Sequence, residues 1–431
     1  MMNREATVSQ KLYLSLYLFL VVFTPDLVPF SMRYLMTIIT VILLAIELLK
    51  NKRLVMSSCQ KQAVWYFIPF FVYLFIAESV HIFEDSIHID EYISTFTNTF
   101  FSFLSAILIG IYIVNYIYSN RFTTQDLITS ILLMMTMQLA CVVLALVSPS
   151  IRTLFNELTI NNGRSDKVLT LMESIENNNI FTRGYGLSNN LFDSFGYIVA
   201  LLITICLNVG LRFNNARITA LSLISLVMPL VNARTGVLLA ALGIAITILY
   251  KFTRNIKSTS IAIVTILSFM LILPSVLQLL PKSMLTYLGE GISEIRSLRS
   301  GEIEGTFGVI LGRDLLWPEN IVFGAGDAPK LMVGHGVDNG YVNSIWSFGI
   351  VGTLIFMACF LRTFYSYATK DYSSQWNPLP LCIAVIFLTY LVKLYSLNNF
   401  GGNAIVLGLL PVLFSTNGLR SEIELPDSHP S

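Results

Sequence analysis

Three arginines have the residue type and the setting to bind a phosphate group. Arg183, Arg234 and Arg313 lie near the ends of apolar runs or in long polar segments between them. A guanidinium is always charged, and its planar fork of donors matches phosphate geometry. The alternative is a membrane anchor whose aliphatic stem follows the lipid. We favour the phosphate role for Arg234, because it lies in the short sequence Asn-Ala-Arg-Thr-Gly (232–236) between two apolar runs, where an anchor has little use.

A second group of candidates precedes another apolar run. Asp338, Asn339 and Tyr341 lie at the start of this run, and His335 lies three residues before the aspartate. A carboxylate or an imidazole at the membrane edge could accept a proton from a hydroxyl group. Asp338 or Asn339 could instead cap the helix by accepting hydrogen bonds from the free amides of its first turn. The two roles are compatible in one residue, so both stay open.

Other chemistry has weaker support in the sequence. Four residues between two apolar runs have the spacing of a helical metal site, namely His81, Glu84, Asp85 and His88. Polar residues are also common at the level of the lipid headgroups, and we predict no metal and no cofactor. Asp193 is either a functional acid or the ion-pair partner of Arg183. The sequence contains no phosphate-binding GxxxxGK[ST] loop and no Asp-x-Asp pair, and its five cysteines have no metal-ligand spacing.

The composition places these residues in a membrane protein. Hydrophobic residues make up 55% of the 431 residues and charged residues only 12%, with a mean hydropathy of +0.70. A water-soluble fold could not cover so much apolar surface with so few charges. The net charge of +1 gives no overall field that would attract a nucleic acid. We therefore predict an all-α polytopic membrane protein, with residues 1–431 forming a single integral membrane domain.

Helical membrane spans need roughly 17–25 mostly apolar residues. The sequence offers about twelve such segments, at approximately 12–27, 31–49, 63–80, 93–118, 127–148, 191–210, 218–232, 236–250, 259–280, 342–366, 379–397 and 402–416.

Basic residues predict the orientation of these spans. With twelve spans and a cytoplasmic N-terminus, fifteen basic residues fall on the cytoplasmic side and three in short loops on the other side. We therefore predict that both termini are cytoplasmic. Two long external segments remain, at 149–190 and 281–341, and a polar cytoplasmic tail follows at 417–431. The candidate residues 183, 313 and 335–341 all belong to the external segments or their borders.

The order of these motifs resembles the O-antigen polymerase family (Wzy) and its relative, the O-antigen ligase family. The resemblance covers about 183–352. Arg313 is followed after ten residues by Gly324, as in the family's Arg-x10-Gly pattern, whereas Ser194 stands where the earlier loop would carry the matching glycine. Asp338-Asn339 precede nine residues and Gly349; ligases have His-Asn at this point, so the aspartate favours the polymerase.

This resemblance implies a metal-independent membrane glycosyltransferase with an architecture like the C-type enzymes. Its substrates would be oligosaccharides linked to undecaprenyl pyrophosphate in the cell inner membrane, with a chain-length regulator and a flippase as further partners. Arg183, Arg234 and Arg313 would bind the pyrophosphate, and Asp338 or His335 would accept the proton of the acceptor hydroxyl. Asn339 and Tyr341 would contact the substrate.

Two rival functions remain open at this stage. An O-antigen ligase would share the fold and the donor but transfer the glycan to the lipid A core. A flippase for lipid-linked oligosaccharides, or another transporter, should carry cations along a central cavity. The predicted spans carry charges mainly near their ends, which favours chemistry at the external surface.

Overall fold

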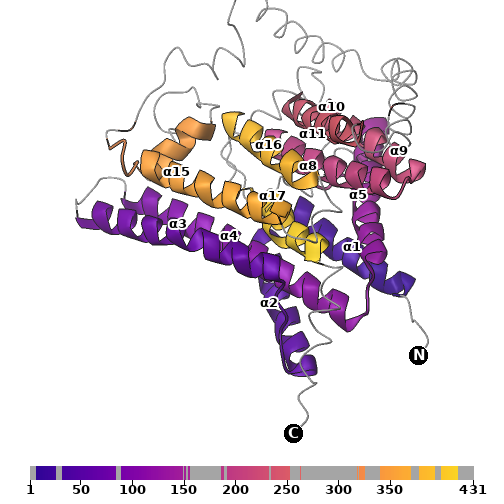
Figure 1. The fold of residues 1–431 in the computed structure, drawn as a ribbon, viewed down its shortest axis with the longest axis horizontal. Coiled ribbons are helices and arrows are strands. Elements are labelled where there is room, and N and C mark those ends of the chain that lie inside the picture. The colour runs from indigo at the N-terminus through magenta and orange to yellow at the C-terminus, as the bar shows by residue number, and fades with distance from the viewer. Residues whose placement is uncertain are drawn as a thin grey trace, which may run out of the picture.

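A computed structural model gives the fold of the chain (Figure 1). It describes residues 6–25, 32–83, 89–148, 150–151, 154–155, 186–188, 192–232, 234–252, 263, 318, 320–325, 340–369, 378–393 and 399–415. Within these ranges the secondary structure is entirely helical and contains no strand, as the sequence predicts.

The first half of the bundle contains five long helices. They are α1 (Val8–Phe23), α2 (Met32–Asn51), α3 (Ser58–Phe83), α4 (Ile89–Ser119) and α5 (Thr124–Val147). Thr7 and Thr123 cap the starts of α1 and α5 with capping boxes. In each box the threonine side chain accepts a hydrogen bond from the backbone amide three residues later, and the side chain of that later residue accepts one from the threonine's backbone amide. These caps fix where two of the apolar runs become helical.

The second half contains the remaining described helices. They are α8 (Phe192–Arg212), α9 (Ala216–Ile224), α10 (Val227–Asn232), α11 (Arg234–Phe252), α15 (Gly340–Thr369), α16 (Leu379–Lys393), α17 (Phe400–Asn403) and the π-helix η2 (Ala404–Leu409). The predicted run 218–232 is therefore two short helices, α9 and α10. The structure does not describe the predicted run 259–280 beyond residue 263.

Seven of the described helices are long and apolar enough to cross a membrane, and four shorter apolar helical stretches accompany them. These seven candidate spans lie within α2, α3, α4, α5, α8, α11 and α15. This confirms a polytopic helical architecture, whereas the total of twelve spans stays a prediction. The long segments 149–190 and 281–341 and the tail 417–431 lie almost wholly outside the described residues.

The central helix of the bundle is α8, which is buried along almost its entire length. Close contacts with its neighbours occur where side chains are small: Gly236 of α11 lies against Gly196, and Gly243 lies against Thr204. The outer helices instead present apolar side chains to the surroundings. Trp65 is 71% exposed and Leu354 is 61% exposed, as expected for helices in contact with lipid.

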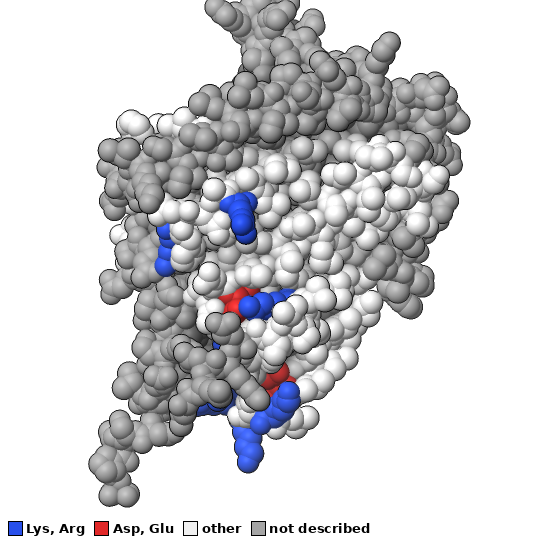
Figure 2. Space-filling view, turned by 90° about the vertical axis from the view of Figure 1, so that its right-hand side faces the viewer, with Lys and Arg blue, Asp and Glu red and all other residues white. Residues whose placement is uncertain are grey.

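One end of the bundle collects the basic side chains, and we call it the basic end. There α1 and α5 begin, joined by an ion pair of 2.5 Å between Lys11 and Asp126, and α4 ends, where Asn120 accepts a hydrogen bond from Gln10. The described basic side chains at this end are Lys11, Lys50, Lys52, Arg53, Lys61, Arg121, Arg212, Arg217, Lys251 and Arg362. Figure 2 looks onto the right-hand side of Figure 1, where α1 begins and α4 ends, and shows Lys and Arg side chains, some of them beside acidic ones, among uncharged residues.

The other end of the bundle, which we call the opposite end, is where α1 and α16 finish and where α8, α11 and α15 begin. Ser188, just before α8, donates a hydrogen bond to the carbonyl of Phe23 at the end of α1. Among the described residues, Arg33 is the one basic side chain near this end, and the backbones of Arg234 and Lys393 also lie there. The described helices therefore separate the basic residues as the sequence predicts.

Candidate functional site

The predicted site residues fall at the opposite end of the bundle or outside the described residues. Tyr341 is described with its side chain, and Arg234 is described as the first backbone residue of α11, directly after α10. The other five lie outside the described residues, namely Arg183, Arg313, His335, Asp338 and Asn339.

Tyr341 lies in the first turn of α15 and is partly buried. Its hydroxyl donates a hydrogen bond of 3.0 Å to the carbonyl oxygen of Leu388 in α16. The side chain thus links the start of α15 to the last part of α16. This contact holds the phenol ring in place at the start of α15.

The two glycines that end the sequence motifs are in contact. A Cβ atom added to Gly324 would lie 2.5 Å from the backbone nitrogen of Gly349. Gly349 interrupts α15, because its φ of 67° and ψ of 175° are not helical and suit only glycine. The segment 320–325, which belongs to the second long external segment (281–341), therefore packs into a break in α15.

Backbone hydrogen bonds join the segment 320–325 to the break in α15. In an unbroken helix, the amide of Ile350 would bond to the carbonyl of Trp346. Here the amide of Ile350 donates to the carbonyl of Ile321 at 2.9 Å, and the carbonyl of Trp346 accepts from the amide of Ala325 at 2.7 Å. The segment thus satisfies both groups that the break leaves free, and we call this arrangement the glycine joint.

The shape of the segment follows from its own residues. Asn320 accepts hydrogen bonds from the amides of Val322 and Phe323 through its side chain, and its carbonyl accepts from the amide of Gly324. Gly324 has a φ of 80°, which closes the turn and would strain another residue. The turn brings the backbone of Gly324 so close to α15 that a Cβ atom at position 324 would not fit.

Tyr73 of α3 contacts both sides of the glycine joint. Its hydroxyl lies 2.6 Å from the carbonyl oxygen of Phe348 and 3.2 Å from that of Val322. Its ring lies roughly parallel to that of Phe323, at an angle of 16° and with the centroids 6.4 Å apart. The site analysis of the sequence missed Tyr73, because a tyrosine inside an apolar run has no pattern that separates it from other aromatic residues.

A second polar cluster lies at the opposite end, around the start of α8. Asn399 accepts a hydrogen bond from the amide of Gly402, and its side-chain nitrogen lies 3.5 Å from both the carbonyl of Ser194 and the hydroxyl of Tyr390. The ring of Tyr390 stacks on that of Tyr197, with the centroids 4.1 Å apart. Ser194 stands where the family pattern has glycine, and its hydroxyl lies 3.3 Å from that of Tyr390.

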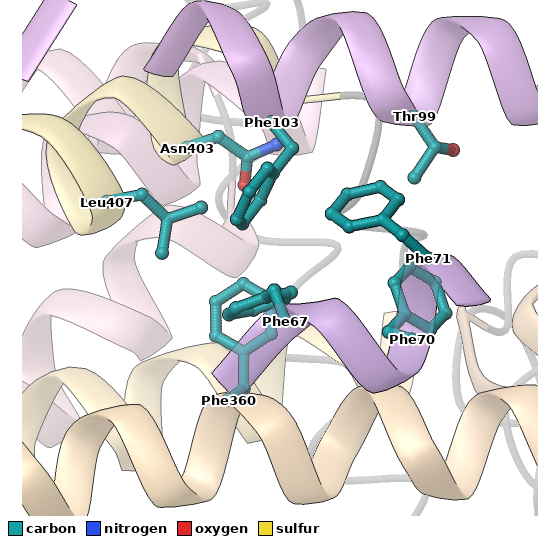
Figure 3. Close-up of a pocket in the computed structure, with 8 residues that line it drawn as sticks. All are labelled: Phe67, Phe70, Phe71, Thr99, Phe103, Phe360, Asn403 and Leu407. Atoms are coloured by element: carbon teal, nitrogen blue, oxygen red, sulfur yellow. The ribbon is translucent and has the colours of Figure 1, made fainter. Parts of the chain in front are cut away.

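The cavity in Figure 3 is too small to hold a substrate. Its volume is about 10 Å³, which is at the lower limit for a single water molecule. It lies among packed aromatic rings of α3, α4 and α15, with one side closed by η2 and the residue before it. The lining residues are Phe67, Phe70, Phe71, Thr99, Phe103, Phe360, Asn403 and Leu407. This cavity is a packing gap of the core.

A larger hollow of about 610 Å³ lies at the basic end, away from the glycine joint. Lys11, Asp126 and Arg212 contribute its charges, and threonine side chains from the start of α5 contribute hydroxyl groups. Lys11 and Asp126 are paired with each other. The hollow contains none of the predicted site residues.

The described residues contain no group of three or more His, Cys, Asp or Glu side chains placed to hold a metal ion. Of the four residues with metal-site spacing, His81 lies in the last turn of α3, and Glu84, Asp85 and His88 lie outside the described residues. Asp193 is the second residue of α8, and its side chain is not described.

The fold places the chain in the class of polytopic helical membrane proteins. Comparison of its sequence with models of known protein families gives no match, and comparison with curated proteins gives none. The assignment of a function therefore depends on the residues and on the geometry of the opposite end.

Proposed function

We propose that this chain is a membrane glycosyltransferase of the O-antigen polymerase type. It would join oligosaccharide repeat units carried on undecaprenyl pyrophosphate, at the periplasmic face of the inner membrane. The observation that carries the proposal is the glycine joint. The Arg-x10-Gly and Asp-Asn-x9-Gly patterns were identified separately in the sequence, and their glycines, Gly324 and Gly349, pack against each other.

The joint links the two chemistries that such a reaction needs. One side belongs to the segment that follows Arg313, a candidate ligand of the pyrophosphate. The other side belongs to the helix that follows Asp338, a candidate base. Asn339 and Tyr341 would contact the sugar, and Arg234 would add a second cation from the start of α11. The joint brings together the two segments that follow these candidates in the sequence, and this supports a shared site.

The reaction consists of one group transfer. The anomeric carbon of the growing glycan loses its bond to the pyrophosphate oxygen and gains a bond to a hydroxyl oxygen of the lipid-linked repeat unit. Asp338, or His335 in its place, accepts the hydroxyl proton. Negative charge grows on the departing undecaprenyl pyrophosphate, and Arg234, Arg313 and Arg183 stabilise it more strongly in the transition state than in the ground state.

The positions of the basic residues support a periplasmic site. In bacterial inner membranes, cytoplasmic loops are enriched in Lys and Arg. If the basic end is cytoplasmic, both termini are cytoplasmic, and the glycine joint and Tyr341 lie at the periplasmic side. A flippase and a chain-length regulator would then act on the same lipid-linked substrates and products.

Two rivals differ from the polymerase in measurable ways. A flippase should carry cations along its interior, yet the middle third of every described helix is free of Asp, Glu, Lys and Arg. A ligase shares the fold, and the glycolipids of a deletion strain distinguish it from a polymerase. A lipid A core that carries a single repeat unit identifies a polymerase, whereas loss of all attached glycan identifies a ligase. Retention of the normal ladder of chain lengths would refute the proposed function.

A further inference from the structure

We infer that Tyr73 is a positioning residue that holds the two halves of the candidate site together through the glycine joint. This inference deepens the proposed function and rests on it. The described contacts of Tyr73 at the joint are with the backbone carbonyls of Phe348 and Val322 and with the ring of Phe323. It acts on the backbone of the two segments that meet at the joint.

The glycine joint needs hydrogen-bond donors from outside α15. At the break in α15, not every backbone carbonyl of the helix accepts a hydrogen bond from an amide of the same helix. Ala325 supplies one amide to Trp346. The carbonyl of Phe348, directly before the break, receives the hydroxyl of Tyr73 at 2.6 Å. A third helix, α3, thus supplies a donor at the point where α15 is interrupted.

The same hydroxyl lies between two segments. The hydroxyl has one proton to donate, and two carbonyl oxygens lie within hydrogen-bond distance of it, that of Phe348 at 2.6 Å and that of Val322 at 3.2 Å. Phe348 belongs to α15, and Val322 belongs to the segment 320–325. Removal of this hydroxyl therefore weakens the contact of α3 with both segments and leaves carbonyl oxygens in a buried site with fewer donors.

Packing holds the tyrosine in place. The side chain is 7% exposed, and Gly352 of α15 lies so close that a Cβ atom there would overlap the ring. Phe323 covers it from the segment side. Phenylalanine would keep this packing and lose only the hydroxyl, so Tyr73→Phe isolates the hydrogen bonds.

Tyr17 provides a matched control. It is 4% exposed, and its hydroxyl lies 2.8 Å from the hydroxyl oxygen of Thr40, which links α1 to α2 away from the glycine joint. Tyr17→Phe therefore also removes one buried phenol hydroxyl from a helix contact. The two variants differ in which contact they weaken.

The experiment measures two quantities on the full chain. The first is glycan polymerisation in the deletion strain carrying each variant, divided by the amount of folded protein from size-exclusion chromatography. The second is hydrogen exchange of the amides in 320–325 and 345–350, measured by mass spectrometry on the purified protein. We expect Tyr73→Phe to lower polymerisation per folded molecule at least about tenfold. We also expect it to speed exchange in both segments, because the joint opens more often. Tyr17→Phe should change neither quantity.

Each other outcome would overturn the inference. If Tyr73→Phe polymerises normally per folded molecule, or if both variants lose activity equally, Tyr73 has a structural role only. Unchanged exchange in 320–325 and 345–350 would show that the hydroxyl does not hold the joint. If exchange increases as expected but the wild-type chain forms no polymer, the joint stands, whereas the proposed function and the role of Tyr73 in that reaction both fail.

Discussion

Replacement of Gly349 by alanine tests the glycine joint most directly. The backbone at this residue has a φ of 67° and a ψ of 175°, which costs an L-residue about 1–3 kcal/mol. The added Cβ atom would also overlap the carbonyl group of Val322. The segment 320–325 must then move away, with the loss of two backbone hydrogen bonds worth about 1 kcal/mol each.

The helix can recover part of this energy. If α15 becomes continuous at residue 349, the amide of Ile350 regains its bond to Trp346, worth about 1 kcal/mol. A continuous helix would also relieve the strain at residue 349, so the net destabilisation would then be about 1 kcal/mol. If the break persists, strain and lost hydrogen bonds together cost roughly 3–5 kcal/mol. At an unfolding entropy of about 2.1 cal/mol/K per residue, we expect the melting temperature of this 431-residue chain in detergent to fall by about 1–5 °C. The assay is loss of the monodisperse peak in size-exclusion chromatography after heating. Polymerisation in the deletion strain should fall in parallel.

Leu354→Ala is the matched control, because Leu354 lies on the same helix and is 61% exposed to the surroundings. It should change the melting temperature little. A Gly349→Ala variant with the melting temperature and glycan ladder of the wild type would refute the reasoning, since it would mean that alanine fits the break and the segment together.

Three further predictions concern the candidate site residues and the orientation. Arg234→Lys and Arg313→Ala should each express normally and shorten the glycan ladder, because lysine lacks the donor fork and alanine lacks the charge; unchanged ladders in both would remove the arginines from the site. Asp338→Asn should abolish polymerisation at normal protein levels, since asparagine caps a helix as well as aspartate but cannot take up a proton; retained activity would leave Asp338 as a cap. Reporter fusions after Ile160 and after Leu298 should both read as periplasmic, and a cytoplasmic signal from either would contradict the predicted topology.

Most of the described helices could be predicted from the sequence, because a membrane helix must be apolar along its whole length. The run predicted at 342–366 lies within α15 (Gly340–Thr369), and the run at 93–118 lies within α4 (Ile89–Ser119). Boundaries differ by a few residues, because helices continue beyond the apolar core. The α1 cap at Thr7, for example, begins the helix four residues before the predicted run.

The break in α15 could not be predicted in the same way. Hydropathy averages over a window, and Gly349 lies in a window as apolar as any other part of the helix. The interruption at Gly349 becomes visible only in three dimensions, where Gly324 of the segment 320–325 packs against it. The same holds for Tyr73, because its hydroxyl has partners only after α3 and α15 have packed together.

The motifs predict the residues of the candidate site, and the structure adds how two of their glycines meet. The glycines at 324 and 349 were noted for their spacing from Arg313 and Asp338, and spacing in sequence says nothing about contact across more than twenty residues. Their contact is new information. Tyr341 was predicted to touch the substrate, yet its hydroxyl bonds to α16, a partner that its position in the sequence could not reveal.

The interruption at Gly349 also makes α15 two rods joined at one residue. The nine residues 340–348 form the shorter rod, which is about 13 Å long at 1.5 Å per residue. A change of only 10° in the angle between the rods would shift the far tip by about 2 Å. Asp338 lies two residues beyond that tip, and proton transfer needs the base within about 2.6–3.2 Å of its donor. The hydrogen bond from Tyr341, in the first turn of the shorter rod, to Leu388 of α16 opposes such a tilt, so the angle at a single glycine and one contact with α16 together fix the tip of this rod.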